Sequence, residues 1–507
     1  MSAVLRSVRT YLSFSVTAGA LLAAAACNDS LVAPTNPAIH PAGRARSDVA
    51  AGATSASCAA IATAHPGSAD GNYAVRNAAG NTFVVYCAGM SGSPVAYLTL
   101  PTQGSASNFG SWSVPNSSSP STITTWYSRV QFDVDQLQIV TDDHTFAHSN
   151  NSHVPGPGVD LDWWDFGNAA GCSWGDDGGA NVDLNGTPFS INDMIYVDGW
   201  FPTGSINGVY YGWGDGTLVT GKSMNLTGGG DCGDAGIRGN HLQVAFSGPD
   251  LPSPTAHVGA VSGNEGASVA LSASASGSSG VPVWTSWDLG DGTTGTGPIP
   301  ASHTYADNGN YTITFTATDG ATTPTTVTAI ATIANVAPTV STIPGATIMV
   351  GETYTASGTF SDPGADTWTA TVDYGSGATA LALSGRSVAL SNTYIRAGTY
   401  TVDVTVTDDD NGAGSAIATV QVLSPAQAGV VLQQMVSSLA PGDAQALTQS
   451  LTAFAASVAR GNTTAAAGQL NAFQNKLGAL KNSGRISDAS YALLSGYAQR
   501  VGAALGT

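Results

Sequence analysis

The sequence predicts a mainly β multidomain protein that ends in an α-helical bundle, and three observations lead to this prediction. Its 507 residues are several times the usual length of one domain. Charged residues make up only 10% of the chain, and alternating stretches of Thr, Val, Ser and Ala fill its middle, which is typical of β modules outside the cytoplasm. Near residue 424 the composition changes to Ala, Leu and Gln with apolar residues at helical spacing, which predicts the bundle.

The N-terminus has the layout of a bacterial lipoprotein signal peptide. Arg6 and Arg9 precede an uncharged run that ends in four alanines and Cys27. This run is shorter than the ~20 residues of a membrane-spanning helix. We therefore expect residues 1–26 to be removed and Cys27 to carry a lipid. Cleavage nearby, which would leave Cys27 as an unpaired thiol, and a short membrane anchor are the alternatives.

Residues 27–55 are rich in Pro, Ala, Ser and Asn without periodicity, which predicts a flexible tether. The protein is thus expected to be exported, and to be either lipid-anchored in the membrane at the cell envelope or secreted.

The charge of the chain excludes several classes of partner. Acidic and basic residues number 34 and 15, so the formal charge of −19 disfavours nucleic acid and anionic membrane surfaces. Only two of the acidic residues are glutamates, Glu265 and Glu352. The His-Glu-x-x-His motif of zinc proteases is therefore absent, whereas abundant aspartate suits turns and calcium loops.

Four further cysteines precede residue 250, and an even number in an oxidising compartment predicts two disulfides. The sequence allows three connectivities. We favour Cys58 with Cys87 and Cys172 with Cys232, because each pair lies within one half of this region.

Residues 56–250 are predicted to form one β-rich domain, because short apolar strands alternate with turns rich in Gly, Asn and Ser. The predicted strands are Thr82–Tyr86, Val95–Leu100, Ser128–Phe132, Leu137–Val140, Ile195–Val197 and Leu242–Phe246.

This region resembles the GON domain, which is found at the C-terminus of some secreted ADAMTS metalloproteases. The segments that carry the resemblance span nearly the whole region: Cys58–Ile61, Asp70–Tyr73, Val85–Met90, Tyr97–Pro101, Arg129–Phe132 and Asn181–Phe189. Animal GON domains are cysteine-rich, so their disulfide pattern cannot be carried over. In the proteases the zinc site belongs to a separate catalytic domain, which we do not find in this sequence. The resemblance therefore implies an ancillary domain without catalytic residues.

Three histidines in this region are candidate metal ligands. His144, His148 and His153 lie within ten residues of one another and follow Asp142 and Asp143, a density typical of zinc sites. Ligands at positions i and i+4 need a helix, whereas this stretch is strand and turn in the GON family. Surface or core histidines are therefore the alternative.

Two aromatic groups are candidates for ligand binding. In the first, carboxylates beside indoles suit a sugar-binding platform or a calcium loop, and a solvated acidic loop with buried indoles is the alternative. In the second, aromatic faces would stack on sugar rings or hold a peptide if they lined a groove, and would fill the core otherwise. The residues concerned are Asp160, Asp162, Trp163 and Trp164 in the first group and Trp200, Tyr211 and Trp213 in the second. No cofactor is certain, and Ca²⁺ and Zn²⁺ are the candidate ions.

Residues 251–336 and 337–423 repeat one pattern. Tyr305 and Tyr311 stand six residues apart in the first copy, as do Tyr394 and Tyr400 in the second. Alternate apolar residues follow in both copies, which predicts a half-buried strand. Upstream, Trp287-Asp-Leu-Gly-Asp-Gly in the first copy aligns with Val372-Asp-Tyr-Gly-Ser-Gly in the second, where a strand enters a glycine turn.

These motifs resemble the PKD domain, an immunoglobulin-like β-sandwich that is common in bacterial surface proteins. The resemblance implies spacing and adhesion without an active site, and a rigid stalk is the simplest form of that role. Ser376 of the second copy replaces the turn aspartate of the first, which weakens any calcium or special turn role there.

Residues 424–507 are predicted to form three or four helices. Ser424 with Pro425 begins the first helix, Gly461 and Gly484 end later ones, and Ser487 caps the last. The segments Gln469–Leu477 and Ser483–Ser487 resemble the FIMAH or FIVAR domain of bacterial extracellular proteins. This resemblance implies a cap on the β stalk or a unit that binds a surface partner.

Taken together, these features favour a non-catalytic surface lipoprotein that binds an extracellular protein or polysaccharide through the GON-like domain, with PKD modules as spacer and adhesive units. The alternative is a metal-dependent extracellular hydrolase, either a protease or a glycosidase, which would need the three histidines to converge or two carboxyls about 5 to 9 Å apart in a cleft. A third hypothesis, a purely structural envelope protein, predicts neither a groove nor an exposed aromatic surface.

Overall fold

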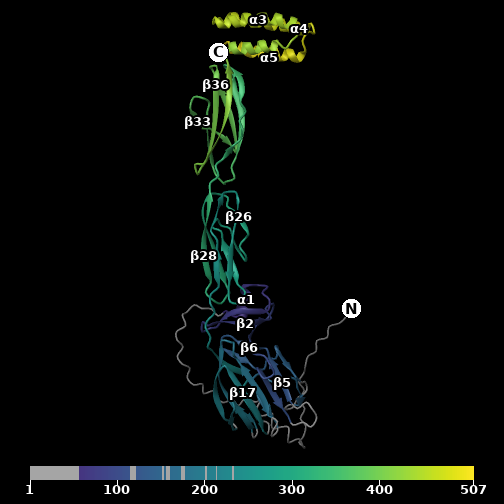
Figure 1. Ribbon diagram of the computed structural model, residues 1–507, viewed down its shortest axis with the longest axis vertical. Coiled ribbons are helices and arrows are strands. Elements are labelled where there is room, and N and C mark those ends of the chain that lie inside the picture. The colour runs from purple at the N-terminus through teal and green to yellow at the C-terminus, as the bar shows by residue number, and fades with distance from the viewer. Residues whose placement is uncertain are drawn as a thin grey trace, which may run out of the picture.

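The protein is a rod of four units in series, as Figure 1 shows. The computed structural model describes residues 56–114, 122–150, 154–155, 160–172, 177–199, 202–212, 214–230 and 233–506. A β-rich N-terminal domain stands at one end, two β-sandwiches form the shaft, and a helical bundle lies at the other end. The predicted mainly β multidomain architecture is confirmed. The predicted signal peptide, Cys27 and the tether lie outside the described residues.

The N-terminal domain begins with a short helix and continues as strands, and all six strands predicted from the sequence are present. The described elements are α1 (Cys58–Ala64), β1 (Gly71–Arg76), β2 (Thr82–Ala88), β3 (Val95–Thr99), β4 (Phe109–Ser113), β5 (Thr122–Tyr127), β6 (Arg129–Asp133), β7 (Gln138–Val140), β8 (Ala147–Ser149), β9 (Val154–Pro155), β10 (Asp160–Leu161), β11 (Ala169–Gly171), β12 (Gly178–Asp183), β13 (Phe189–Gly199), β14 (Pro202–Ile206), β15 (Val209–Tyr211), β16 (Gly216–Gly221), β17 (Ser223–Gly230), β18 (Gly233–Ile237) and β19 (His241–Phe246).

Two sets of strands enclose the core of this domain. Strands β1, β2, β3, β6 and β7 form an antiparallel ladder that continues through β19 to β13. Strands β5, β4, β12, β17, β14 and β15 form the second set in the same way. Phe83, Phe189 and Met224, which come from both sets, belong to one buried cluster. The packed core therefore lies between the two sets.

The two β-sandwiches share one topology. In the first, the sheet β21-β28-β27-β24-β25 faces the pairs β20-β23 and β22-β26. In the second, the sheet β30-β37-β36-β32-β33 faces β29-β31-β35-β34. The parallel pairing of β21 with β28 recurs as that of β30 with β37. The first sandwich comprises β20 (Thr255–Val258), β21 (Val261–Asn264), β22 (Ser268–Ala270), β23 (Ala273–Ser276), β24 (Trp284–Asp288), β25 (Thr294–Thr296), β26 (Ser302–Thr304), β27 (Gly309–Thr318) and β28 (Thr325–Ala334). The second comprises β29 (Thr339–Val340), β30 (Ala346–Met349), β31 (Thr353–Ser361), β32 (Trp368–Asp373), β33 (Ala378–Leu381), β34 (Leu383–Ser384), β35 (Ser387–Thr393), β36 (Gly398–Asp408) and β37 (Ala413–Leu423).

The predicted alternation of the closing strands is confirmed. In β27 the side chains of Ile313, Phe315 and Ala317 are buried, and the residues between them are more exposed. In β36 the same pattern buries Val402 and Val404. Each sandwich thus buries one face of its longest hairpin against its own core.

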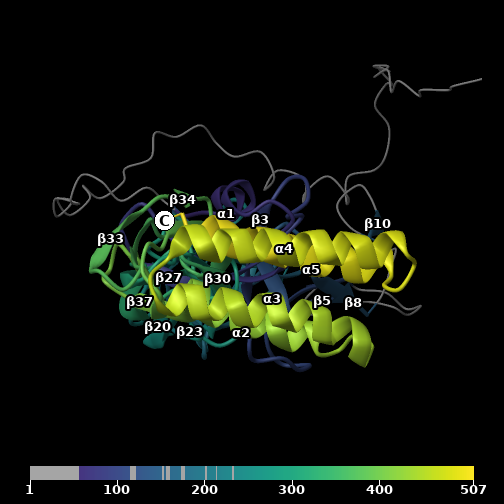
Figure 2. The same ribbon diagram turned by 90° about the horizontal axis from the view of Figure 1, so that it is seen from above.

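Four helices form the C-terminal bundle, at the upper limit of the predicted number. They are α2 (Pro425–Val436), α3 (Pro441–Ala459), α4 (Thr463–Asn482) and α5 (Asp488–Ala504). Ser424 begins α2 with a capping box, and the Ser487 side chain caps α5. Gly461 and Gly484 adopt positive φ of 71° and 70° after α3 and α4, as predicted for helix ends. Seen along the rod, the helices run side by side across its end (Figure 2).

Candidate functional site

The disulfides constrain the N-terminal domain at its start. Cys58 in α1 and Cys87 in β2 form a disulfide, which is the pairing that the sequence favoured. Cys172 is also disulfide-bonded. Cys232 lies outside the described residues, so its pairing with Cys172 stays a prediction.

Two segments that the sequence marked separately meet on one face of the N-terminal domain. The amide of Phe166 donates a hydrogen bond of 2.9 Å to the carbonyl of Thr141, which holds the two segments together. Tyr127, at the end of β5, donates a hydrogen bond of 2.6 Å to the carbonyl of Trp164. Burial and the neighbouring carboxylates, Asp165 first among them, raise the pKa of the Tyr127 hydroxyl. These contacts bring the segment 142–144 beside Trp163 and Asp165, and together these residues form an acidic and aromatic surface.

Trp163 is the exposed aromatic side chain of this surface. Its indole is 39% exposed and stacks on the His144 ring, with centroids 5.6 Å apart and planes within 21°. The His144 Nε2 atom lies 3.5 Å from a carboxylate oxygen of Asp165. A flat apolar face therefore stands beside hydrogen-bond acceptors, which is the chemistry that a sugar ring with its hydroxyl groups can use.

The remaining predicted site residues are distributed differently. Trp164 packs against Trp112 at a centroid distance of 4.9 Å, and its Nε1 donates to the carbonyl of Asn168, so it serves the domain interior. Tyr211 packs partly against the core, and Asp162 is exposed. His153, Trp200, Trp213 and the side chain of Asp160 lie outside the described residues.

The histidine metal site stays a prediction. His148, in β8, stacks on Trp126 at 5.2 Å, whereas His144 stacks on Trp163. Within the described parts of the chain, the groups of three ligand atoms close enough to share an ion contain only carboxylates, all from the two β-sandwiches and the turns between their strands. The fold therefore gathers hard oxygen ligands in the shaft.

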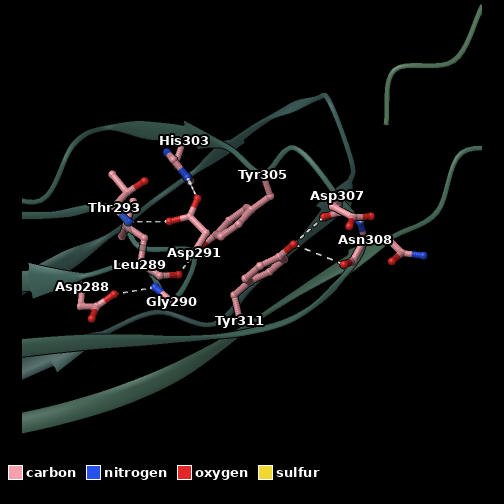
Figure 3. Close-up of polar contacts among 10 residues, drawn as sticks. All are labelled: Asp288, Leu289, Gly290, Asp291, Thr293, His303, Tyr305, Asp307, Asn308 and Tyr311. Atoms are coloured by element: carbon pink, nitrogen blue, oxygen red, sulfur yellow. Dashed lines mark hydrogen bonds and ion pairs between the residues drawn. The ribbon is translucent and has the colours of Figure 1, made fainter. Parts of the chain in front are cut away.

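The glycine turn of the first sandwich is an ordered polar network, which Figure 3 shows. Asp291 accepts hydrogen bonds from His303, at 2.6 Å, and from the Thr293 amide, at 3.0 Å. Burial opposes ionisation, but these hydrogen bonds outweigh it and lower the pKa of Asp291. In the second sandwich Ser376 and Asn392 replace this aspartate and histidine, so both partners of the pair are missing together.

The tyrosine pair that marked the repeat has the same structure in both sandwiches. The ring centroids of Tyr305 and Tyr311 are 4.5 Å apart, and those of Tyr394 and Tyr400 are 4.3 Å apart. The Tyr305 hydroxyl donates to the carbonyl of Leu289 in the turn, and Tyr394 donates to the corresponding turn. Both copies thus keep two tyrosine rings in contact, stacked in the first sandwich and tilted in the second, and one ring of each pair is hydrogen-bonded to the glycine turn.

Family models match three segments of this shaft and bundle. The model of the PKD domain matches residues 252–334 and 335–422, and that of the FIMAH domain matches residues 437–503. The chain contains two PKD domains and a FIMAH domain. Such domains are typical of extracellular or surface proteins and indicate an adhesive or spacer role. The GON resemblance and the lipoprotein signal lie outside these matches and stay predictions.

Solved structures resemble parts of the rod. The PKD domain of an M14-like peptidase from Thermoplasmatales archaeon SCGC AB-540-F20 is 27% identical, covering 18% of this chain and 98% of its own, with a TM-score of 0.15. Fibronectin(III)-like modules of Clostridium thermocellum CbhA are 17% identical over 33% of this chain and 94% of theirs, with a TM-score of 0.16. The titin domains z1z2 in complex with telethonin are 18% identical over 34% of this chain and 96% of theirs, with a TM-score of 0.21.

No curated protein matches the chain. In the described segments, no helix has both the length and the apolar character that crossing a membrane requires.

The N-terminal domain contacts the first PKD domain directly. The His65 ring stacks on the indole of Trp284, with centroids 3.6 Å apart and planes within 2°. The Arg76 guanidinium donates to the carbonyl of Ala321, and Ala74 packs in a small buried cluster that includes Ala321. Aromatic, polar and apolar contacts together join the two domains.

The helical bundle contacts the second PKD domain through both apolar and ionic groups. Met349 and Leu423 of that domain belong to the hydrophobic core of the bundle. Arg500 of α5 donates two hydrogen bonds to Glu352, at 2.6 and 2.7 Å. These hydrogen bonds outweigh burial and lower the pKa of Glu352. The bundle is therefore fixed on the end of the shaft.

Proposed function

We propose that the protein is a non-catalytic surface lipoprotein that binds an extracellular polysaccharide or protein through its N-terminal domain, while the PKD pair acts as a spacer. The observation that carries this proposal is the exposed Trp163, which stacks on His144 beside the Asp165 carboxylate. Of the two ligand classes, this surface favours polysaccharide. The apolar C–H groups of a sugar ring can stack on the flat indole, and its hydroxyl groups can donate hydrogen bonds to the adjacent acceptors.

The order of the domains sets the direction of the rod in this proposal. A lipid on Cys27 would lie 29 residues before the first described residue, so the tether would lead straight into the N-terminal domain. The recognition surface then lies nearest the membrane, and the FIMAH domain points away from it. Replacing Cys27 with serine should move the protein from the membrane fraction to the soluble fraction. Unchanged membrane attachment would contradict lipidation at this cysteine.

Binding to a glycan array and an extracellular-protein array, in calcium and in chelator, tests the recognition role. We compare the full chain with Trp163→Ala and with Tyr210→Ala, which removes another exposed aromatic ring, 80% exposed, from the same domain. Loss of a central aromatic contact should weaken binding by about 2 kcal/mol, or about 30-fold, in the first variant and leave the second unchanged.

Two outcomes would contradict this assignment. Equal binding by the wild type and Trp163→Ala would exclude the surface around Trp163. Absence of binding together with metal-dependent cleavage of a glycan or protein would favour the hydrolase alternative.

A further inference from the structure

Five carboxylates from the two PKD domains converge at the junction between these domains. Glu265 and Asp307 belong to the first domain, whereas Asp362, Asp366 and Asp408 belong to the second. Carboxylate oxygens of Glu265, Asp307 and Asp366 lie within 4.8 Å of one another. Those of Asp362, Asp366 and Asp408 do the same. Asp366 is therefore common to a group that spans the junction and a group within the second domain.

Four of these five side chains are buried, and two of the four, Glu265 and Asp366, are not fully hydrogen-bonded, whereas both carboxylate oxygens of Asp362 and of Asp408 accept hydrogen bonds. The exposed fractions of Glu265, Asp362, Asp366 and Asp408 are 1%, 3%, 7% and 4%. Glu265 accepts a hydrogen bond of 2.6 Å from the Val336 amide through Oε1 only. Its Oε2 atom and both carboxylate oxygens of Asp366 have no hydrogen-bond partner. These oxygens face the other carboxylates of the cluster, where a buried charge is costly unless it is paired.

Among the residues that the structure describes, no cationic side chain neutralises the cluster. None of the ion pairs among the described residues includes any of its five carboxylates. The arrangement therefore needs positive charge that the described chain does not supply.

The two domains hold the carboxylates together through their backbones. The Ala365 amide donates a hydrogen bond of 2.8 Å across the junction to the carbonyl of Ala306. Gly266, at a φ of 67°, leaves no room for a side chain, because a Cβ there would stand 2.6 Å from the Cβ of Pro363. This close approach brings the loop after Asp362 against the first domain.

Neighbouring groups complete the site. The Tyr311 hydroxyl donates to the carbonyls of Asp307 and Asn308, at 2.9 and 3.3 Å, which positions the loop that carries Asp307 (Figure 3). In the linker, Asn335 donates to Asp408 at 3.0 Å, while its buried amide oxygen has no partner.

We propose that this junction binds Ca²⁺ between the two PKD domains, with Asp366 as the shared ligand and Glu265 as the ligand from the first domain. All candidate donors are oxygens, which select a hard cation. Ca²⁺ accepts six to eight oxygens in irregular geometry, whereas Mg²⁺ requires an octahedron and keeps several waters. Bound Ca²⁺ then fixes the angle between the domains, so the stiffness of the spacer depends on extracellular calcium.

Calcium titration of the full chain, after removal of divalent ions by a chelator, tests this proposal. We expect wild-type binding by calorimetry with a Kd of about 10⁻³ M or tighter, as in extracellular calcium modules. Asp366→Asn and Glu265→Gln should each weaken binding at least tenfold. Asp488→Asn, which removes one acidic charge from the exposed start of α5, should bind as the wild type does.

Thermal unfolding separates a metal ligand from a structural residue. In chelator, Asp366→Asn should melt above the wild type, because the substitution removes an unpaired buried charge. In calcium at 100 times the Kd, the wild-type shaft should gain roughly 10 °C and exceed the variant. Small-angle X-ray scattering should show a narrower range of lengths for the wild type in calcium than in chelator.

Several outcomes would overturn the proposal. Absence of both heat and a melting shift when calcium is added to the wild type would do so, as would an equal calcium response in Asp366→Asn. An equal response to Mg²⁺ at the same concentration would exclude calcium selectivity. Wild-type affinity in Glu265→Gln would confine the site to the second domain and exclude the interdomain role.

Discussion

Removal of the disulfide between Cys58 and Cys87 should destabilise the N-terminal domain strongly. The bond closes a loop with a sequence separation of 29 residues. Chain-entropy arithmetic for such a loop gives about 3.6 kcal/mol at 25 °C. In the double variant Cys58→Ala with Cys87→Ala, the free energy of unfolding of the N-terminal domain should fall by about this amount. The helix α1 has only seven residues, so it depends on this bond and on its Ser57 cap for its position.

Tryptophan fluorescence during urea denaturation measures this loss. Seven of the ten tryptophans lie between Trp112 and Trp213, so the signal reports mainly on the N-terminal domain. For an m-value of about 2 kcal/mol/M, the urea midpoint should fall by roughly 2 M. Circular dichroism at the helical band reports on the C-terminal bundle and serves as the internal control, because its transition should not move.

A fall of less than about 1 kcal/mol in the free energy of unfolding would refute the reasoning. It would mean that the native contacts of α1 already hold the loop closed without the disulfide. An equal shift of the helical transition would also refute it, because the stabilisation would then not be local to the first domain.

Three further perturbations test the packing and the electrostatics of the rod. Trp284→Ala removes the stack on His65, the residue that follows α1, and should weaken the first junction by about 1 kcal/mol, which scattering would detect as a broader range of lengths. Asp234→Asn should stabilise the N-terminal domain. Burial raises the pKa of Asp234 to about 6, so the wild type loses stability as pH rises through that value. Calorimetry should therefore show that the stability of the variant relative to the wild type increases from no difference near pH 4 to about 2 kcal/mol at pH 8. Asp291→Asn should destabilise the first PKD domain by about 1 kcal/mol at neutral pH. Because the pKa of Asp291 is lowered, its contribution is present above the ordinary pKa and disappears as pH falls through the folded value. Ser376→Ala, at the equivalent turn, is the matched control.

Each of these expectations has a contrary outcome. A Trp284→Ala chain as stiff as the wild type would show that the stack does not fix the junction. A pH-independent effect of Asp234→Asn would exclude its ionisation as the cause. Equal losses in Asp291→Asn and Ser376→Ala would assign the effect to the turn backbone instead of the ion pair.

Local patterns made most elements predictable from the sequence. The alternation after Tyr311 and Tyr400 places apolar side chains on one face of a strand, and no distant contact is needed to recognise it. The capping residues Ser424 and Ser487 satisfy amides within their own first turns. The helix α1 was missed, because its seven residues lack a long periodic pattern.

The sites depended on long-range contacts, so the sequence predicted them only in part. It marked the histidine segment and the tryptophan segment, but not that the hydrogen bond from Phe166 to Thr141 joins them. It did not mark the junction cluster at all. Glu265 and Asp366 are about a hundred residues apart, and they approach only because Gly266 lets Pro363 pack against it. The one available signal in the sequence was Glu265 itself, because it is one of only two glutamates in the chain.

Both glutamates of the chain stand at junctions of the second PKD domain, and their counterions differ. Glu352 binds Arg500 of the helical bundle, so that junction carries its own cation. Glu265 faces aspartates at the other junction, with no described cation beside it. Each of two treatments should therefore affect only one junction. Arg500→Gln should weaken the contact between the bundle and the second PKD domain by about 1 kcal/mol, whether or not calcium is present.

Chelation, by contrast, should loosen only the junction between the PKD domains. Distances between spin labels placed on either side of each junction would measure both effects in one chain. If chelation broadened the distances across the Glu352 junction as well, the calcium response would not be specific to the acidic cluster, and the stiffness of the rod would have to arise from a general screening of its charge.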